Sequence, residues 1–120
     1  MPEINYRVNT SSLGTTSTIR YSPIKGVINS CILHFPSGCN SLVEVFLNIG
    51  TTQILPAPAR GTGTANVGIA LDGTTQSFNI SHHVDKDDPI ELNIKNHDDT
   101  EDHTISAIIY ISPDVTYTGP

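Results

Sequence analysis

Apolar and polar residues alternate along short stretches of this chain, and no stretch shows the period of an amphipathic helix. Near the start, Ile4, Tyr6 and Val8 alternate with Glu3, Asn5 and Arg7, and Ile105 to Ile111 repeats this pattern near the end. Because successive side chains of a strand point to opposite faces of its sheet, a period of two predicts strands with one face in a core. The chain is therefore expected to be all-β.

Nine such stretches are separated by residues typical of turns, such as Pro36-Ser37-Gly38 and Asp72-Gly73. We expect an antiparallel β-sandwich, jelly-roll-like, with eight or nine strands. Charged residues make up 15% of the chain, which is below the share of about 25% that is typical of globular proteins. Many polar positions hold Thr, Ser or Asn instead, as is common in β proteins. The expected strands are residues 4–8, 15–21, 27–35, 42–49, 52–55, 67–71, 76–84, 89–95 and 103–112.

The alternation also predicts which face of each strand is buried. In the third strand Val27, Cys31, Leu33 and Phe35 should face the core. In the fourth, Val43, Val45, Leu47 and Ile49 should point inward, with Glu44 and Asn48 outward. The last strand is apolar on both sides, since Ile108 and Tyr110 lie opposite its core face. Its second face should be covered by a loop or by another subunit.

The chain of 120 residues fits one domain, 1–120, with extended arms at 1–5 and 113–120. Residues 56–65 form the one long irregular segment. The two cysteines, Cys31 and Cys39, could form a disulfide or remain free thiols. If Pro36 to Gly38 were the tip of a tight hairpin, the cross-strand partner of Cys31 would lie nearer Val43 than Cys39.

The charge and the apolar runs of the chain argue against nucleic acid and membrane as partners. The net charge is −6 and the six basic residues are scattered, so no basic patch for nucleic acid is expected. The longest apolar runs, such as Ile105 to Ile111, are too short to span a bilayer. The first residues, Met1 to Asn5, do not resemble a signal peptide. We therefore expect neither nucleic acid nor membrane as a partner, and synthesis in a cytoplasm.

The densest group of polar side chains runs from Asn96 to His103. It offers candidate metal ligands, because carboxylates suit hard cations and imidazoles suit transition metals. The competing interpretation is a solvated acidic loop in which Asn and Asp provide turns. No glycine stands where a calcium loop needs its sharp turn, so we assign no metal and no cofactor. If the loop does bind a cation, the candidate ligands are His97, Asp98, Asp99, Glu101 and His103.

Sequence signs of catalysis are absent. No G-x-S-x-G, phosphate-binding loop or dinucleotide-binding motif followed by a helix occurs. His82 and His83 stand near Asp85, but neighbours in a strand face opposite sides, so both cannot bind one metal. His34 is expected at the surface or at an interface. We therefore predict that the protein is not an enzyme and has no catalytic residue.

Part of the chain resembles the strand-loop-strand element of small blue-copper proteins. The resemblance covers Asp87 to Asp98 and His103 to Ile105, and His103 would match the first copper ligand. The family also needs Cys, His and Met ligands further on, and none follows His103. The similarity therefore implies a β-sandwich hairpin without a copper site.

A second resemblance is to the small decoration, or cement, proteins on the capsids of tailed viruses. It rests on Phe35 to Val45, Gln53 to Pro56, Ala70 to Asp72 and Asp98 to Ile105. It implies a jelly-roll-like protomer, often trimeric, that binds the major capsid protein, stabilises the lattice and resides in the virion. Two alternatives remain open: a carbohydrate- or ligand-binding β-sandwich, and a metal-binding cupin-like protein in which histidines of separate strands converge.

Overall fold

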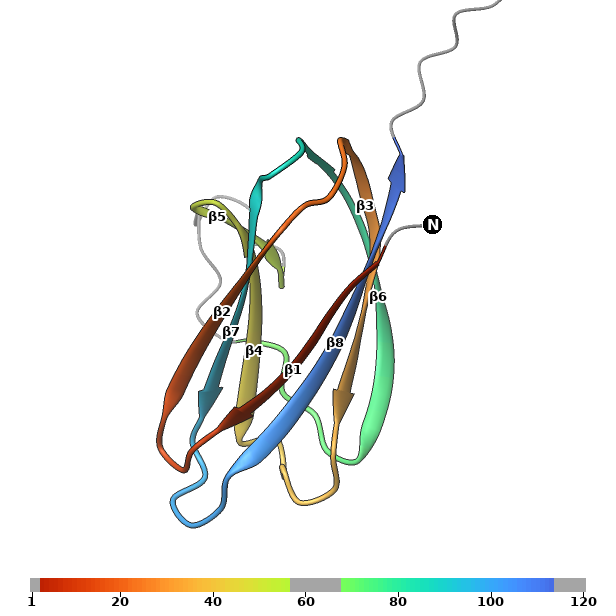
Figure 1. The fold of residues 1–120 in the computed structure, drawn as a ribbon. Coiled ribbons are helices and arrows are strands. Elements are labelled where there is room, and N and C mark those ends of the chain that lie inside the picture. The colour runs from red at the N-terminus through yellow and green to blue at the C-terminus, as the bar shows by residue number, and fades with distance from the viewer. Residues whose placement is uncertain (1–2, 57–67, 114–120) are drawn as a thin grey trace, which may run out of the picture.

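A computed structural model describes residues 3–56 and 68–113 of the chain. This part forms eight strands in two four-stranded antiparallel sheets that pack face to face (Figure 1). Sheet A has the order β1-β8-β3-β6 and sheet B the order β2-β7-β4-β5. The strands are β1 (Glu3–Thr10), β2 (Thr15–Tyr21), β3 (Gly26–Phe35), β4 (Val43–Ile49), β5 (Thr52–Leu55), β6 (Thr74–Val84), β7 (Pro89–Asn96) and β8 (His103–Pro113).

The strands are paired in a nested order. β1 pairs with β8, β2 with β7, β3 with β6 and β4 with β5, and all four pairs are antiparallel. Two further pairings, β3 with β8 and β4 with β7, join these pairs into the two sheets. The predicted antiparallel β-sandwich is thus confirmed. The finer jelly-roll assignment stays a prediction, which this nested order favours.

The core is formed by the inner faces of both sheets and is almost entirely aliphatic. In β8 the predicted residues Ile105, Ala107, Ile109 and Ile111 are all buried, and β4 also buries its predicted face. β7 contributes Ile90, Leu92 and Ile94 from the opposite sheet. Each buried Ile, Leu or Val side chain removes apolar surface from water, which stabilises the fold by about 1.5–3 kcal/mol per residue.

One face prediction was wrong, for β3. Cys31, Leu33 and Phe35 face the core as expected, but Ile28 takes the place predicted for Val27. The pairing of β3 with both neighbours shifts between Ile28 and Ser30, which is a β-bulge. An extra residue in a strand reverses the sides on which the following residues lie, so the alternation cannot be extended backward across it.

The connection between β3 and β4 also differs from the sequence-based prediction. The two strands belong to different sheets, so Pro36 to Gly38 is not the tip of a hairpin. Two apolar strands on either side of a turn can pair in one sheet, or the turn can lead from one sheet to the other. The sequence pattern of the strands and the turn is the same in both cases. Asp72 holds this connection in place, because its carboxylate accepts hydrogen bonds from the backbone N–H groups of Gly38 and Asn40 at 3.0 and 2.9 Å.

Two expected boundaries also change. Glu3 to Asn5, assigned to an arm, pair with Ile108 to Tyr110 and so begin β1. In place of a strand at 67–71, Ile69 forms a single bridge with Val45. Residues 1–2, 57–67 and 114–120, with the rest of the expected arms and most of the irregular segment, lie outside the described residues.

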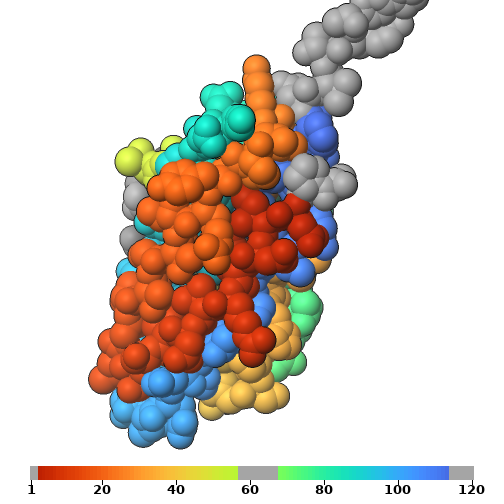
Figure 2. Space-filling model, in the orientation of Figure 1, coloured from red at the N-terminus to blue at the C-terminus, as the bar shows by residue number. Residues whose placement is uncertain are grey.

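Tyr6 links the two sheets through the core. Its hydroxyl donates a hydrogen bond of 2.7 Å to the backbone carbonyl of Ile90, 84 residues away in sheet B. Burial raises the pKa of Tyr6 well above its usual range, although the nearby Arg20 guanidinium opposes that shift. Arg20 of β2 lies 5.8 Å from the centre of the Tyr6 ring. Together with a 3.1 Å hydrogen bond between Thr10 and Thr16, this closes the side of the sandwich where β1 and β2 meet, shown in Figure 2.

Replacing Tyr6 with Phe should lower the free energy of unfolding by about 1–3 kcal/mol, because the Ile90 carbonyl would stay buried without a partner. The measurement is urea unfolding at neutral pH. Tyr21→Phe is the matched control, since the Tyr21 side chain is 63% exposed and should lose almost nothing. Equal losses in both variants would contradict the assigned role of Tyr6.

Candidate functional site

The Asn96–His103 loop, the first candidate from the sequence, is a closed hydrogen-bond network. His103 Nε2 lies 2.9 Å from Asp98 Oδ2. The other oxygen of Asp98, Oδ1, accepts bonds from the backbone N–H groups of Thr100 and Glu101 and from the Thr100 hydroxyl. Asn96 donates to the carbonyls of Thr10 and Glu101 and accepts from the Asp98 N–H. These side chains therefore use their polar atoms to shape the loop.

The five candidate metal ligands of this loop do not converge. His97 is exposed and pairs with Glu44 of β4 at 3.0 Å, on a different side of the loop backbone from the buried Asp98–His103 pair. Asp99 and Glu101 are exposed. Within residues 3–56 and 68–113, no three His, Cys, Asp or Glu side chains form a group able to hold a metal ion. His103, the match to a copper ligand, has Asp98 as its partner.

Asp98 should make the protein sensitive to acid. Hydrogen bonds, first from His103 and then from Thr100, hold the pKa of its carboxyl well below the usual range. Since the pKa is lower in the folded state than in the unfolded chain, the carboxylate stabilises the fold above about pH 4, and this contribution is lost as the pH falls toward the folded pKa.

Asp98→Asn should therefore melt at a lower temperature than wild type at neutral pH, and the difference should shrink in acid. Thermal unfolding followed by circular dichroism between neutral pH and pH 2 would measure it. Asp99→Asn, on the exposed neighbour, should follow the wild-type curve. A constant difference at every pH would refute the ionic role of Asp98.

The remaining histidines are separate. His34 is exposed, as expected, and its Nδ1 lies 2.7 Å from the Thr75 hydroxyl. His82 is half-buried and His83 is exposed, in line with their predicted opposite faces. A cupin-like site needs histidines of separate strands to converge on one metal. The five histidines do not do so in this structure: His34, His82, His83, His97 and His103.

Cys31 and Cys39 are free, and both are buried. Burial raises the pKa of the Cys31 thiol to about 12. Burial, aided by the charges of Asp72 and Asp98, also raises the pKa of Cys39. A catalytic cysteine needs a lowered pKa so that the thiolate forms. Although Cys39 is near Asp98, it therefore lacks the properties of a nucleophile.

Both thiols should be slow to react with Ellman's reagent in the native protein and should react rapidly in denaturant, with two thiols released per chain. A reducing agent should leave the melting temperature unchanged, since no disulfide staples the fold. A melting temperature that drops on reduction would show instead that Cys31 and Cys39 pair.

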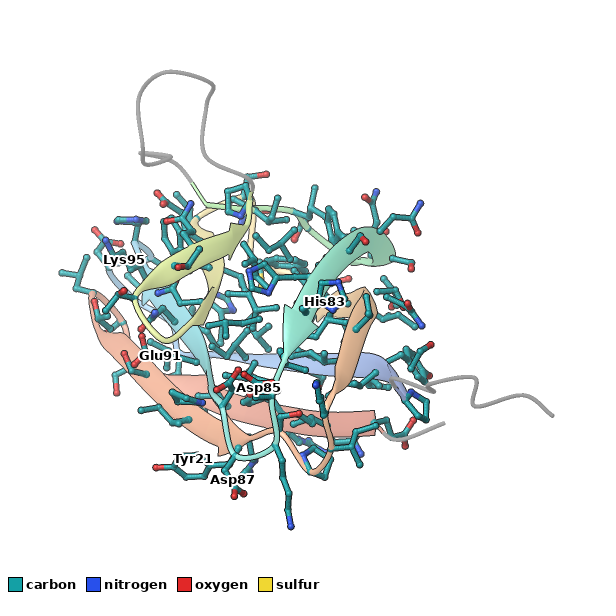
Figure 3. The ribbon with its side chains drawn as sticks, turned by 90° about the horizontal axis from the view of Figure 1, so that it is seen from above. Tyr21, His83, Asp85, Asp87, Glu91 and Lys95 are labelled. Atoms are coloured by element: carbon teal, nitrogen blue, oxygen red, sulfur yellow. The ribbon has the colours of Figure 1, made fainter. Side chains whose placement is uncertain are left out.

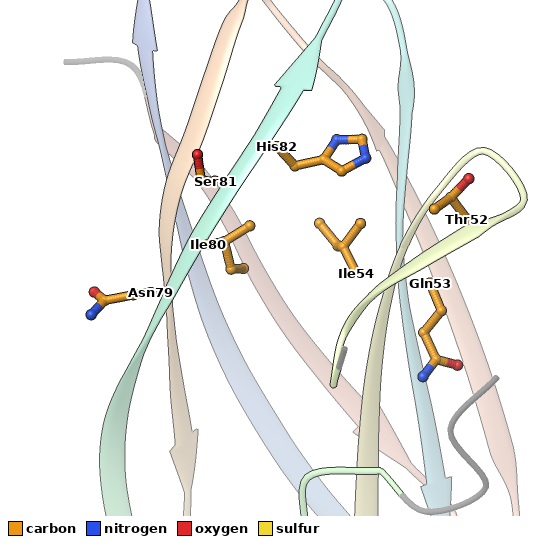
Figure 4. A pocket seen from close by; sticks show the side chains of 7 residues that line it. All are labelled: Thr52, Gln53, Ile54, Asn79, Ile80, Ser81 and His82. Atoms are coloured by element: carbon orange, nitrogen blue, oxygen red, sulfur yellow. The ribbon is translucent and has the colours of Figure 1, made fainter. Parts of the chain in front are cut away.

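A cavity of about 320 Å³ opens between the edges of the two sheets on the side opposite β1 and β2. β5 supplies Thr52, Gln53 and Ile54, and β6 supplies residues 79–82 (Figure 4). Figure 4 shows that Ile54 and Ile80 lie in the middle of the opening, and that the His82 ring points from β6 toward β5. The lining holds no Asp, Glu, Lys or Arg. Its volume lies at the lower end of the range for small-molecule sites, about 300–1,000 Å³.

The outer faces of the two sheets have different chemistry. On sheet B, Glu91 and Lys95 occupy the central strand β7 and Glu44 occupies β4, with Lys95 lying 5.2 Å from the centre of the Phe46 ring. Figure 3 looks along the sandwich and labels Glu91 and Lys95, with Tyr21 projecting from β2.

The outer face of sheet A is uncharged at its centre. Ile108 of β8 stands opposite Ile32 of β3, and Tyr110 stands opposite Ser30. All three apolar side chains are half-buried. The acidic and basic residues of this face stand on the edge strand β1, at Glu3 and Arg7. The second apolar face of the last strand thus lies on the outside of the sandwich.

Sequence reasoning missed the β5–β6 opening. It placed strands at 52–55 and 76–84 but gave no sign that they lie at neighbouring edges of different sheets. The available signal was the absence of Asp, Glu, Lys and Arg from Thr74 to Val84, which is unusual for a long exposed strand.

The sequence matches no protein-family model and no curated protein. Among solved structures it is similar to FLHE, with 12% identity, 91% of this chain and 96% of that chain covered, and a TM-score of 0.47. It is also similar to Aeromonas hydrophila PliG, a periplasmic inhibitor of g-type lysozyme (10% identity, 92% and 86% covered, TM-score 0.45). A third is the Yersinia pseudotuberculosis-derived mitogen YPM, at 14% identity, 98% and 92% covered and a TM-score of 0.47. None of these similarities is strong enough to assign a function.

Proposed function

We propose that this chain is a non-catalytic binding protein that acts through the outer face of sheet A, and that its partner is a viral capsid lattice. The observation that carries the proposal is the uncharged, partly apolar centre of that face, formed by Ile32, Ile108 and Tyr110. Half-buried apolar side chains rimmed by polar residues are typical of protein–protein contact sites.

The polar clusters support a non-catalytic role, because their groups are occupied in holding the fold. Asp98 and His103 bind each other, Asp72 caps the turn after β3, and burial raises the pKa of both cysteine thiols. No pair of these groups has the nucleophile–base geometry that acyl transfer or hydrolysis needs.

The outer face also favours a protein partner over a carbohydrate. Sugar-binding surfaces need exposed aromatic rings, and Tyr21 on sheet B is the one aromatic residue that is highly exposed in the described part of the chain. Tyr6 is buried and Tyr110 is half-buried. The resemblance to capsid cement proteins makes the expected partner more specific. It is a regular lattice of the major capsid protein.

Ile108→Lys should weaken binding to capsid shells at least about tenfold, since it places a charge in the centre of the contact. The assay is co-sedimentation of the purified protein with empty shells of the virus or provirus whose genome carries the gene. Ile19→Lys is the matched control, because Ile19 is 45% exposed on sheet B. Thermal melting would verify that both variants fold.

Two results would overturn parts of the proposal. If the wild-type protein does not sediment with the shells, the capsid role is wrong. If Ile19→Lys weakens binding as much as Ile108→Lys, binding does not occur through the outer face of sheet A.

A further inference from the structure

The four strands at the edges of the two sheets differ in how they are protected from pairing with another chain. β1 carries Glu3 and Arg7, β2 carries Arg20, and β5 has only four residues. Charges and short length are the usual means by which proteins keep sheet edges from pairing. β6 has eleven residues, from Thr74 to Val84, and contains no Lys, Arg, Asp, Glu or Pro.

We propose that β6 is a self-association edge, on which β6 of a second copy pairs antiparallel about a twofold axis to join two A sheets into one. A twofold axis is the natural choice because an antiparallel pair of identical strands is symmetric, and each copy then presents the same edge. The inference is independent of the proposed capsid role, since it uses the edge strand of sheet A and not the apolar centre of the outer face.

The composition of this edge removes the main electrostatic obstacle to pairing with a second copy. Two chains of net charge −6 repel each other, so a contact between them must avoid acidic residues. Asp72 and Asp85 lie just beyond the two ends of β6, and the eleven residues between Gly73 and Asp85 carry no carboxylate.

The sequence of β6 selects a register centred on Asn79. In that register Ser77 stands opposite Ser81 of the second copy, and Thr75 stands opposite His83, on the outer face. On the inner face Phe78 stands opposite Ile80, so the half-buried apolar residues of this strand cover each other in both halves of the contact. The register uses all eleven residues, and Asn79 meets its own copy on the axis.

The contact would have two structural consequences. The cavity between β5 and β6, which Ile80 and His82 line, would lie beside the new strand pair. The two outer faces of sheet A would become one continuous surface with two equivalent patches. A bivalent protein of this kind binds a repeating partner more durably than either patch alone.

Charge replacement at Ser77 and Ser81 tests the contact, and both positions are exposed, so the fold should tolerate the changes. Wild type should be a dimer by native mass spectrometry and light scattering. Ser77→Lys with Ser81→Lys places lysine opposite lysine twice and should raise the dissociation constant about tenfold or more. Ser77→Glu with Ser81→Lys places opposite charges together and should restore the dimer. Asn5→Lys with Asn9→Lys, on edge strand β1, should leave the dimer unchanged.

Cysteine cross-linking tests the register. Asn79→Cys should form a covalent dimer on mild oxidation, because residues directly opposite each other have Cα atoms within disulfide range. Thr75→Cys on the same strand should not, since its opposite residue is His83. Cys31 and Cys39 are buried and serve as a constant background.

The outcomes separate this inference from the proposed function. A wild-type monomer or trimer, or a Ser77→Glu/Ser81→Lys variant as weakly associated as the double lysine variant, would overturn self-pairing through β6. Cross-linking of Thr75→Cys as readily as Asn79→Cys would overturn it in the same way. Capsid binding by a monomeric double lysine variant would show that the outer face acts without the dimer.

Discussion

The structure depends on burying the alternate residues of both sheets against one another in a core with no tryptophan. The fully buried large side chains are Ile, Leu and Val together with Phe35. Aliphatic side chains of this size fill the space between the sheets only if each strand keeps its register, because a slip of one residue turns a whole inner face to solvent. The bulge between Ile28 and Ser30 is where β3 adjusts its alternation to meet both β6 and β8.

The same constraint explains why the acidic loop after β7 is structural. β7 lies in sheet B and β8 in sheet A, so the Asn96–His103 loop must cross the end of the sandwich. Its backbone is fastened to the turns beside it, since Leu13 N–H donates to the Asp98 carbonyl and His97 N–H donates to the Leu42 carbonyl. A crossing of this kind leaves many backbone groups without a strand partner, and the Asn and Asp side chains of the loop bind several of them.

Charge is distributed unevenly over the surface that remains. Glu44, Glu91 and Lys95 stand on the central strands β4 and β7 of sheet B, whereas the centre of the outer face of sheet A carries apolar and uncharged side chains. β6, next to that centre, lacks the charges that protect the other long edges. The uncharged face and the uncharged edge therefore belong to the same sheet, and both proposals made above rest on sheet A.

Much of the fold was determined by the sequence itself. A period of two fixes which side chains share a face, so the strands, the inner faces of β4 and β8, and the opposite orientations of His82 and His83 could all be predicted locally. The partners of each strand could not, because a pairing such as that of Tyr6 in β1 with Ala107 in β8 joins residues far apart in the sequence. Tertiary structure also decided that His97 faces Glu44 while Asp98 faces His103, and so divided the cluster that the sequence offered as one set of ligands. Which strands stand at the edges depends on the packing of all eight, and only that packing placed β6 at an open edge and the second face of β8 on the outside.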